Sequence, residues 1–421
     1  MTTAGNARAT RLTWRTMLPA DRAYLALPSS RRPLIVAEQD RGVLAYVRDS
    51  LLARPPRSWR WGWTYAVARE ALRINAVWRL APRARPTLDG NLWLDRPELT
   101  KTLSSGYRIL LLNHNRDASA RFVLLLFGPG DCSPTVAVKF ADAQGADRLH
   151  DENARLRSLA EVLPESLRAT VPSVLYDEQG SQPILATTAQ PGTSMFVAMN
   201  RRNHTRSPVA VRADFAAAAT WLCELQSVTT GPAAHLDIDV DTFAAAHRHL
   251  ASAPTILSDV LDKLLALQHR LRRFAVPRTL VHGDYWPGNL LVNRGTITGV
   301  IDWERAELAG SPVRDLARLA VGYSTYLDRH TRPLRTVAGH RGLVARAPGG
   351  AVTYAMDGVG WYPALVRRFL TDGLERLRLP SSLGPDVMRA EVAAIAAEAT
   401  DLAFACEQWG IFRQACAEAP R

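Results

Sequence analysis

Lysine is scarce in this sequence, which has only three among its 52 basic residues, at Lys101, Lys139 and Lys263. No run of eighteen apolar residues occurs, so no transmembrane segment is expected. The first residues lack the apolar core of a signal peptide. The four cysteines contain no C-x-x-C pair, which argues against a disulfide framework or a cysteine-based zinc site. We therefore expect a globular protein with free thiols in a reducing cytoplasm.

The basic surplus lies mostly in the N-terminal region. Residues 1–100 hold 17 Arg against 8 Asp and Glu, within a total net charge of +12, and they also hold six of the eleven Trp. Residues Trp63–Ala81 suit an amphipathic helix, and the favoured interpretation is an extra helical layer packed on the next domain. A peripheral membrane surface or a protein partner is the alternative. No recognised nucleic-acid module is present, so no specific nucleic-acid partner is predicted.

The stretch Thr279–Glu304 carries the strongest chemical pattern. Short apolar runs bounded by Gly, Pro and Asn predict short buried strands with a polar loop and a hairpin between them. Such an arrangement brings Asp284, Asn289 and Asp302 together at one edge. Carboxylate and carbonyl oxygens are the ligands that Mg²⁺ prefers, with phosphate oxygens completing its coordination shell. The pattern therefore predicts a phosphoryl-transfer site.

The residues H-G-D-x-x-x-x-N followed by I-D-W-E resemble the catalytic segment of the aminoglycoside phosphotransferase and choline kinase group, which has a protein-kinase-like fold. The resemblance implies that Asp284 is the catalytic base and that Asn289 and Asp302 hold magnesium ions. It also implies that His282 packs beneath the loop as a structural residue. A helix-capping Asp among ordinary turn residues is the alternative, but the two elements in this order favour the kinase.

A small antiparallel sheet is expected from about residue 105, because three apolar runs follow one another, joined by short segments. The third run ends in V-A-V-K, which is similar to the V-A-I-K strand of kinases. The resemblance implies that Lys139 contacts the α- and β-phosphates of ATP. Glu152, thirteen residues later at the start of a helical stretch, is expected to pair with Lys139. Asp151 and Glu161 are the competing candidates.

Two further nucleotide contacts are expected. The loop between the first two strands should cover the phosphates, yet it lacks the G-x-G-x-x-G of protein kinases, and Ser119 is the candidate phosphate contact there. The strands 171–177 and 182–188 lead into A-Q-P-G-T-S-M, which is interpreted as the hinge between two lobes. The backbone of Thr187 and Ala189 would face the adenine.

The remaining chain is predicted to form a helical C-lobe. It includes helices at 208–228 and 259–274, and Asp315 is expected to help hold the catalytic loop. A single last helix over 385–417 carries several acidic residues, which either line an acceptor pocket for a cationic substrate or form an outer face. A Gly-, Pro- and Arg-rich insert at 329–351 is either a substrate-binding segment or a disordered loop.

Together these features predict an α+β, bilobal, protein-kinase-like fold. The expected parts are an accessory region at 1–100, a nucleotide-binding N-lobe at 101–190 and a catalytic C-lobe at 191–421. The predicted activity is ATP- and Mg²⁺-dependent phosphoryl transfer to a hydroxyl of a small molecule, such as a sugar, aminocyclitol, amino alcohol or antibiotic. The alternative is a nucleotide-binding pseudokinase or scaffold whose N-terminal region binds a partner or membrane surface. A protein kinase is disfavoured because D-F-G and A-P-E are missing.

Overall fold

The computed structural model describes residues 13–53, 67, 69–73, 83–86, 96, 101, 106–113, 122–142, 145–180, 182–202, 207–248, 254–347 and 349–417. The chain divides into two compact units. Unit 1 contains the described residues within 1–49, 70–153 and 173–189, and unit 2 contains those within 50–69, 154–172 and 190–421. The predicted α+β bilobal fold is confirmed, with a sheet-based first unit and a largely helical second unit.

Unit 1 is built on an eight-stranded antiparallel sheet in the order β3-β1-β2-β4-β5-β6-β8-β7. Its elements are η1 (Trp14–Thr16), β1 (Tyr24–Leu27), β2 (Ile35–Glu38), α1 (Arg41–Tyr46), η2 (Val47–Leu51), β3 (Arg83–Ala84), β4 (Arg108–Asn113), β5 (Phe122–Phe127), β6 (Val136–Phe140), α5 (Ala146–Val162), β7 (Val174–Glu178) and β8 (Ile184–Thr188). Helix α5 passes into unit 2 after Asn153, and η2 does so after Asp49.

The two faces of this sheet have different covers because side chains alternate along each strand. One face holds an apolar cluster that includes Val138 and Phe140 of β6 together with Met17 and Leu18 from the N-terminal segment. Lys139, between these two positions, therefore lies on the opposite face. On β5 that opposite face carries Phe127, whose ring meets Tyr46 of α1 edge-to-face at 5.4 Å.

The first strands of the chain extend the same sheet. Ile35 of β2 pairs with Leu112 of β4, so the apolar run at 34–38 joins the strands that were predicted from residue 105 onward. The N-terminal region therefore adds strands to the sheet. The sequence had predicted an extra helical layer there. Strand β4 is apolar on both faces and needs a partner strand on each edge. Strand β5 pairs with one edge, and β2 pairs with the other. Of Trp63–Ala81 the structure describes only 67 and 69–73, so most of the predicted helix lies outside the described residues.

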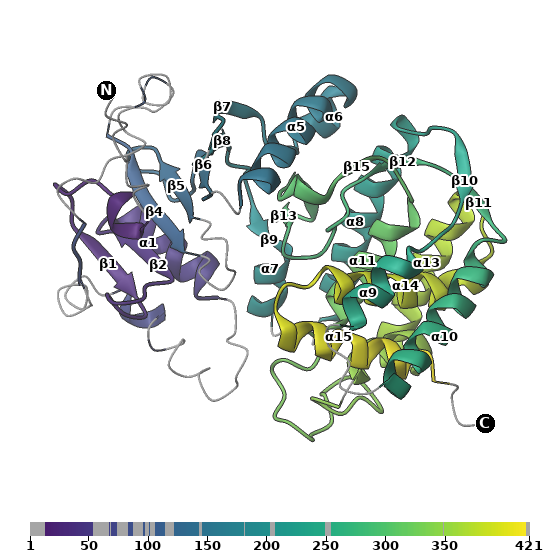
Figure 1. Cartoon of the computed structure of the whole chain (residues 1–421). Helices are drawn as coiled ribbons and strands as arrows, with labels where there is room; N and C mark the ends of the chain where they lie inside the picture. The colour runs from purple at the N-terminus through teal and green to yellow at the C-terminus, as the bar shows by residue number, and fades with distance from the viewer. Residues whose placement is uncertain are drawn as a thin grey trace, which may run out of the picture. The chain divides into compact units, whose positions relative to one another are not determined.

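Unit 2 is mainly helical (Figure 1). Its elements are α6 (Glu165–Arg168), β9 (Thr193–Ser194), α7 (Met195–Arg201), α8 (Pro208–Val228), β10 (Ala233–His235), α9 (Val240–Arg248), α10 (Pro254–Leu271), β11 (Ala275–Pro277), β12 (Thr279–Val281), β13 (Leu290–Asn293), β14 (Thr296–Val300), η5 (Trp303–Arg305), β15 (Glu307–Gly310), α11 (Val313–Ser324), α12 (Gly350–Asp357), α13 (Trp361–Arg376), η6 (Ser381–Leu383), α14 (Gly384–Glu398) and α15 (Leu402–Ala415).

The single C-terminal helix predicted over 385–417 is in fact two helices. Helix α14 ends at Glu398, Ala399 adopts an extended conformation, and Asp401 then caps α15 by accepting a hydrogen bond from the Phe404 N–H at 2.9 Å. An Asp at this position is a strong helix N-cap, because its carboxylate satisfies one of the otherwise unpaired N–H groups of the first turn. The break lets α15 fold back beside α14 (Figure 1).

Two other sequence expectations can be compared with the structure. All four cysteines are free thiols, as predicted. Among the helices that the structure describes, none combines the length and hydropathy that are needed to cross a bilayer.

Replacing Val36 with Ala tests the contribution of β2. Val36 is fully buried in the cluster beneath the sheet, whereas Leu34, just before the strand, is 41% exposed. We expect Val36→Ala to lower the free energy of unfolding by about 2 kcal/mol, since buried methyl groups are lost. Leu34→Ala should change it by no more than about 0.5 kcal/mol. Thermal and denaturant unfolding measure both, and equal effects would show that β2 is not part of the folded core.

Candidate active site

A buried carboxylate fixes the loop that carries Asp284. Strand β12 ends at Val281, and Asp315 in the first turn of α11 then accepts hydrogen bonds from the His282 N–H at 2.8 Å and the Gly283 N–H at 2.9 Å. Asp315 is 1% exposed, and burial raises its pKa to about 7 while the two N–H groups and Arg314 act in the opposite direction. The role that the sequence suggested for Asp315, holding the loop, therefore agrees with its contacts.

His282 supports the loop from below. Its Nδ1 accepts a hydrogen bond from the Asp284 N–H at 3.1 Å, so its Nε2 carries the proton and donates to the Ile301 carbonyl at 3.0 Å. The ring is fully buried against Trp303, with centroids 4.6 Å apart, and burial lowers its pKa. A neutral imidazole that links the loop to the end of β14 is a structural part of the site.

Gly283 is required by geometry at the turn between His282 and Asp284. Its φ is +77°, in the left-handed region, and a Cβ there would lie 2.3 Å from the Arg305 carbonyl oxygen. A side chain at this position would therefore meet both backbone strain and a direct clash.

The carboxylate of Asp284 is held from two sides. Arg318 on α11 donates from Nε to Oδ1 at 2.9 Å and also from Nη2, while the Asn289 amide donates to Oδ2 at 3.0 Å. The same guanidinium donates from Nη1 to Glu391 of α14 at 3.0 Å. Arg318 and Glu391 are almost fully buried, so this hydrogen-bonded ion pair is not screened by water. Asp284 therefore has a fixed orientation before any substrate arrives.

The hairpin of β13 and β14 brings the second acidic residue next to the loop. Leu290 pairs with Val300, and the Ile301 N–H donates to the Asn289 carbonyl at 3.0 Å, which places Asp302 beside Asn289 in the chain trace. Asp302 has a φ of +63°, which a short polar side chain tolerates better than most. The structure brings Asp284 and Asn289 into contact, and the convergence of Asp302 with them stays a prediction.

These residues fit a magnesium ion. The Asn289 amide nitrogen is occupied by Asp284, so its oxygen is the atom left to face a cation, and Asp302 adds a carboxylate. Among the described residues no group of three or more His, Cys, Asp or Glu forms a complete metal site. Two oxygen ligands suit Mg²⁺ in a phosphoryl-transfer site, because substrate phosphates and water supply the other ligands.

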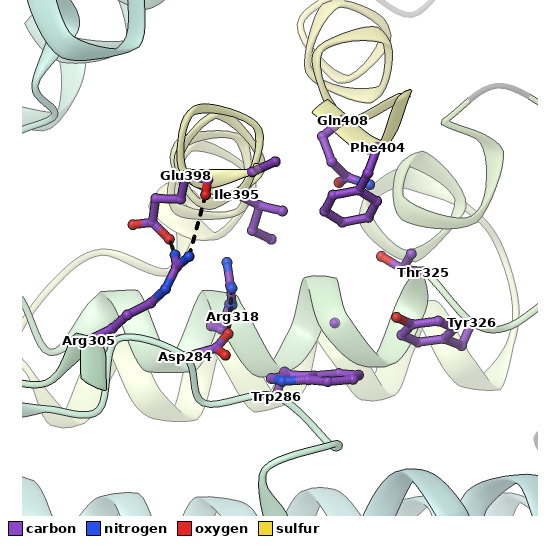
Figure 2. A pocket seen from close by; sticks show the side chains of 12 residues that line it. Asp284, Trp286, Arg305, Arg318, Thr325, Tyr326, Ile395, Glu398, Phe404 and Gln408 are labelled. Atoms are coloured by element: carbon purple, nitrogen blue, oxygen red, sulfur yellow. Dashed lines mark hydrogen bonds and ion pairs between the residues drawn. The ribbon is translucent and has the colours of Figure 1, made fainter. Parts of the chain in front are cut away.

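A cavity of about 240 Å³ opens beside Asp284. Its lining residues come from the Asp284 loop, η5, α11 and its C-terminal end, α14 with the break that follows it, and α15, and they are Asp284, Trp286, Arg305, Arg318, Gly322, Thr325, Tyr326, Ile395, Glu398, Ala399, Phe404 and Gln408. Figure 2 shows Asp284 and Arg318 at one end, Tyr326 and Phe404 at the other, and the Trp286 ring extending between them. None of the described residues of the insert at 329–351 is among them; several line a second cavity instead.

The sequence model of the phosphotransferase enzyme family (APH) matches residues 112–349, which is more than half of the chain and includes the whole loop and hairpin. The chain belongs to the phosphotransferase enzyme family. The predicted membership of the aminoglycoside phosphotransferase and choline kinase group is thereby confirmed. No curated protein matches the chain by sequence.

Several solved structures are similar to this member of the family at low identity. A thermostable mutant of aminoglycoside phosphotransferase APH(4)-Ia in its apo form is 14% identical, with a TM-score of 0.46, and the match covers 73% of this chain and 92% of that one. ADP-bound APH(2'')-Ib is 14% identical, with a TM-score of 0.43 and coverage of 75% and 95%. The gentamicin complex of APH(2'')-IIa is 16% identical, with a TM-score of 0.41 and coverage of 72% and 88%.

In unit 1, Lys139 and Glu152 form the ion pair that was expected. Lys139 Nζ lies 2.5 Å from Glu152 Oε1, and the Glu152 side chain is only 3% exposed. The competing candidates Asp151 and Glu161 are both exposed on α5. A buried carboxylate that fixes a strand lysine is what positions the amine for phosphate oxygens in kinases.

The remaining predicted nucleotide contacts have different outcomes. Ser119 lies outside the described residues. Thr187 is buried in β8, where it pairs with Ala137 of β6, and the Ala189 N–H donates to the Thr135 carbonyl at 2.9 Å. That N–H is therefore already used within unit 1. The division between units falls directly after Ala189, where the hinge was predicted, and adenine contacts at Thr187 and Ala189 stay a prediction.

Sequence reasoning missed Arg318, Arg305 and Gln408. The spacing could have indicated Arg318: it lies three residues after Asp315 and four after Arg314, so its side chain is close to theirs on the surface of the same helix. Arg305, just after Asp302, forms an ion pair with Glu398. Gln408 carried no such signal, since its place in the cavity depends on the break between α14 and α15.

The titration of Asp315 gives a test of the loop anchor. The folded carboxyl, with a pKa of about 7, holds its proton more tightly than an unfolded one at about 4. Its contribution to stability is therefore fully present below about pH 4 and is lost as the pH rises through about 7. We expect the unfolding free energy of the wild type to fall by about 2 kcal/mol more than that of Asp315→Asn between about pH 5 and pH 8.

Thermal unfolding across this pH range measures the difference. Asp372→Asn, which changes an exposed Asp on α13, should follow the wild-type curve. Parallel curves for wild type and Asp315→Asn would show that the buried carboxyl does not titrate in this range.

Proposed function

We propose that this phosphotransferase moves the γ-phosphoryl group of ATP to a hydroxyl of a small molecule. The observation that carries the proposal is the position of Asp284, whose carboxylate faces the cavity beside α14 and α15 while its backbone loop is anchored by Asp315. A fixed carboxylate at the wall of a ligand-sized cavity is what a hydroxyl acceptor needs for alignment.

In the proposed reaction the acceptor hydroxyl oxygen attacks the γ-phosphorus of ATP. The new bond joins that oxygen to phosphorus, the bond from phosphorus to the β,γ-bridging oxygen breaks, and ADP leaves. Asp284 accepts the hydroxyl proton. Arg318 and Asn289 keep the Asp284 carboxylate oriented during the transfer, so little reorganisation is needed at the moment of reaction.

Asn289 and Asp302 would hold Mg²⁺, which supplies charge neutralisation for the phosphate oxygens when it is bound. Lys139, fixed by Glu152, would contact the α- and β-phosphates. A requirement for ATP fits the cytoplasmic location expected from the sequence. An exclusively nucleotide-binding role is not favoured, because the chain has Lys139 in unit 1 as well as Asp284, Asn289 and Asp302 in unit 2. A peripheral partner for residues 1–100 stays a prediction.

Replacing Asp284 with Asn tests the catalytic base. The amide keeps the shape of the carboxylate but cannot accept the hydroxyl proton, so we expect kcat to fall at least about 100-fold. Nucleotide affinity should change by less than about 3-fold, since the phosphates contact other residues. Steady-state kinetics and nucleotide titration measure these values, with Asp372→Asn as the exposed control. Near-normal turnover of Asp284→Asn would contradict the assignment.

Replacing Asp302 with Asn tests the metal ligand without adding backbone strain, because Asn also tolerates positive φ. We expect nucleotide affinity in the presence of Mg²⁺ to fall about 10-fold or more, while affinity without Mg²⁺ and thermal stability stay close to the wild type. Calorimetric titrations with and without Mg²⁺ make the comparison. An unchanged Mg²⁺ effect would remove Asp302 from the metal site.

A further inference from the structure

The cavity beside Asp284 has two chemically different ends. Figure 2 shows the charged side chains of Asp284, Arg318, Arg305 and Glu398 gathered together, with the Tyr326 and Phe404 rings and the Gln408 amide away from them and the Trp286 ring in between. An acceptor that places its hydroxyl at Asp284 must therefore extend its body towards the aromatic end.

Every carboxylate at the charged end already has a guanidinium partner. Asp284 is paired with Arg318, and Glu398 is paired with both Arg305 and Arg314. Behind them, the buried Glu391 is paired with Arg318. A polycationic amino sugar would therefore have to break existing ion pairs, and its ammonium groups would lie close to Arg305 and Arg318. Of the acidic residues that the sequence had offered as a site for cations, Glu391 and Glu398 are thus already neutralised by arginines.

The aromatic end offers flat apolar surfaces. The rings of Trp286 and Tyr326 lie 5.9 Å apart with a 32° angle between their planes, and Phe404 on α15 faces the same space. Aromatic rings can also bind a quaternary ammonium. Here, however, the Arg329 guanidinium already lies over the Tyr326 ring at 4.2 Å, so this ring already has a cation beside it.

Gln408 adds a polar group that the fold leaves unused. Its side chain is 1% exposed and lines the cavity, and its Nε2 has no hydrogen-bond partner among the described residues. A buried amide without a partner is costly, so such groups in native proteins usually meet water or a ligand. A carbonyl-type oxygen on the acceptor would accept this hydrogen bond.

Resting on the proposed function, we propose that the acceptor is an uncharged alcohol with an aromatic ring and a carbonyl-type oxygen. The ring packs against Trp286, Tyr326 and Phe404, the oxygen accepts a hydrogen bond from Gln408, and the hydroxyl faces Asp284. The cavity of about 240 Å³ has room for one such ring beside the hydroxyl at Asp284. Polycationic amino sugars are excluded by charge.

Four probes separate these features. N-(2-hydroxyethyl)benzamide has the ring, the carbonyl and the hydroxyl without charge. 2-(Benzylamino)ethanol replaces the carbonyl with a methylene and is cationic, and 4-phenyl-1-butanol has neither the carbonyl nor the charge. Kanamycin is the polycation. Affinities come from saturation-transfer NMR titrations of the full chain, and transfer is followed as phosphorylated probe and ADP formed in equal amounts from Mg-ATP.

We expect the benzamide to bind at least about 10-fold more tightly than 2-(benzylamino)ethanol, and kanamycin not to bind in the cavity. Equal or tighter binding of 2-(benzylamino)ethanol or kanamycin would overturn the inference, and so would a failure of the benzamide to bind. If the benzamide binds as expected but no probe is phosphorylated, the proposed function fails while the inference about the cavity stands. If kanamycin is phosphorylated with a kcat/KM above that of the benzamide, the proposed function stands and the inference about the acceptor fails.

The Gln408→Met variant tests the hydrogen bond directly. Methionine keeps the length of the side chain but removes the amide, so we expect the benzamide Kd to rise about 10-fold while the Kd of 4-phenyl-1-butanol stays unchanged. Gln414→Met makes the same change on the same helix at an exposed position outside the cavity and should leave both values unchanged. If Gln408→Met weakened the binding of both probes while its thermal stability stayed intact, Gln408 would not act through a hydrogen bond to the carbonyl of the benzamide.

Discussion

The site depends on one buried carboxylate. Asp315 accepts two hydrogen bonds from successive backbone N–H groups, and this fixes the turn from which Asp284 projects. The same helix presents Arg318 one turn later, so the anchor of the loop and the partner of its functional carboxylate move as a single rigid body. Glu391 then links that helix to α14, and the wall of the cavity is thereby coupled to the loop. Buried hydrogen-bonded charges of this kind order a site because breaking one leaves another unpaired.

Local residue chemistry made much of this predictable. The spacing of Asp284 and Asn289 is encoded within one short loop, so the sequence was enough to place them together. The Lys139–Glu152 pair could also be predicted, because V-A-V-K followed by a helix that begins with a Glu resembles the strand and helix that carry the Lys–Glu pair of kinases. The acid Asp315 could be assigned to the loop through the family resemblance.

The features that escaped prediction depend on tertiary packing. The C-terminal stretch has helical composition throughout, and the break at 399–401 is marked only by Asp401, whose capping role competes with continuing the helix. Without that break, Phe404 and Gln408 cannot be assigned to the cavity. Likewise, Glu391 and Glu398 of α14 appear available for cations in the sequence, and only their pairing with Arg305, Arg314 and Arg318 shows that they are not.

The order of strands in unit 1 has a consequence for synthesis of the chain. Strands β1 and β2 leave the ribosome first, yet β2 pairs with β4 about seventy residues later, and β8 lies between β6 and the earlier-made β7. The sheet therefore cannot be completed until residue 188 has been made, and β2 has an open edge until β4 has been made. Long-range pairing of this kind slows folding and exposes nascent strands to wrong partners. Until β4 is made, the β1–β2 pair is therefore a part of unit 1 that other extended chains could pair with.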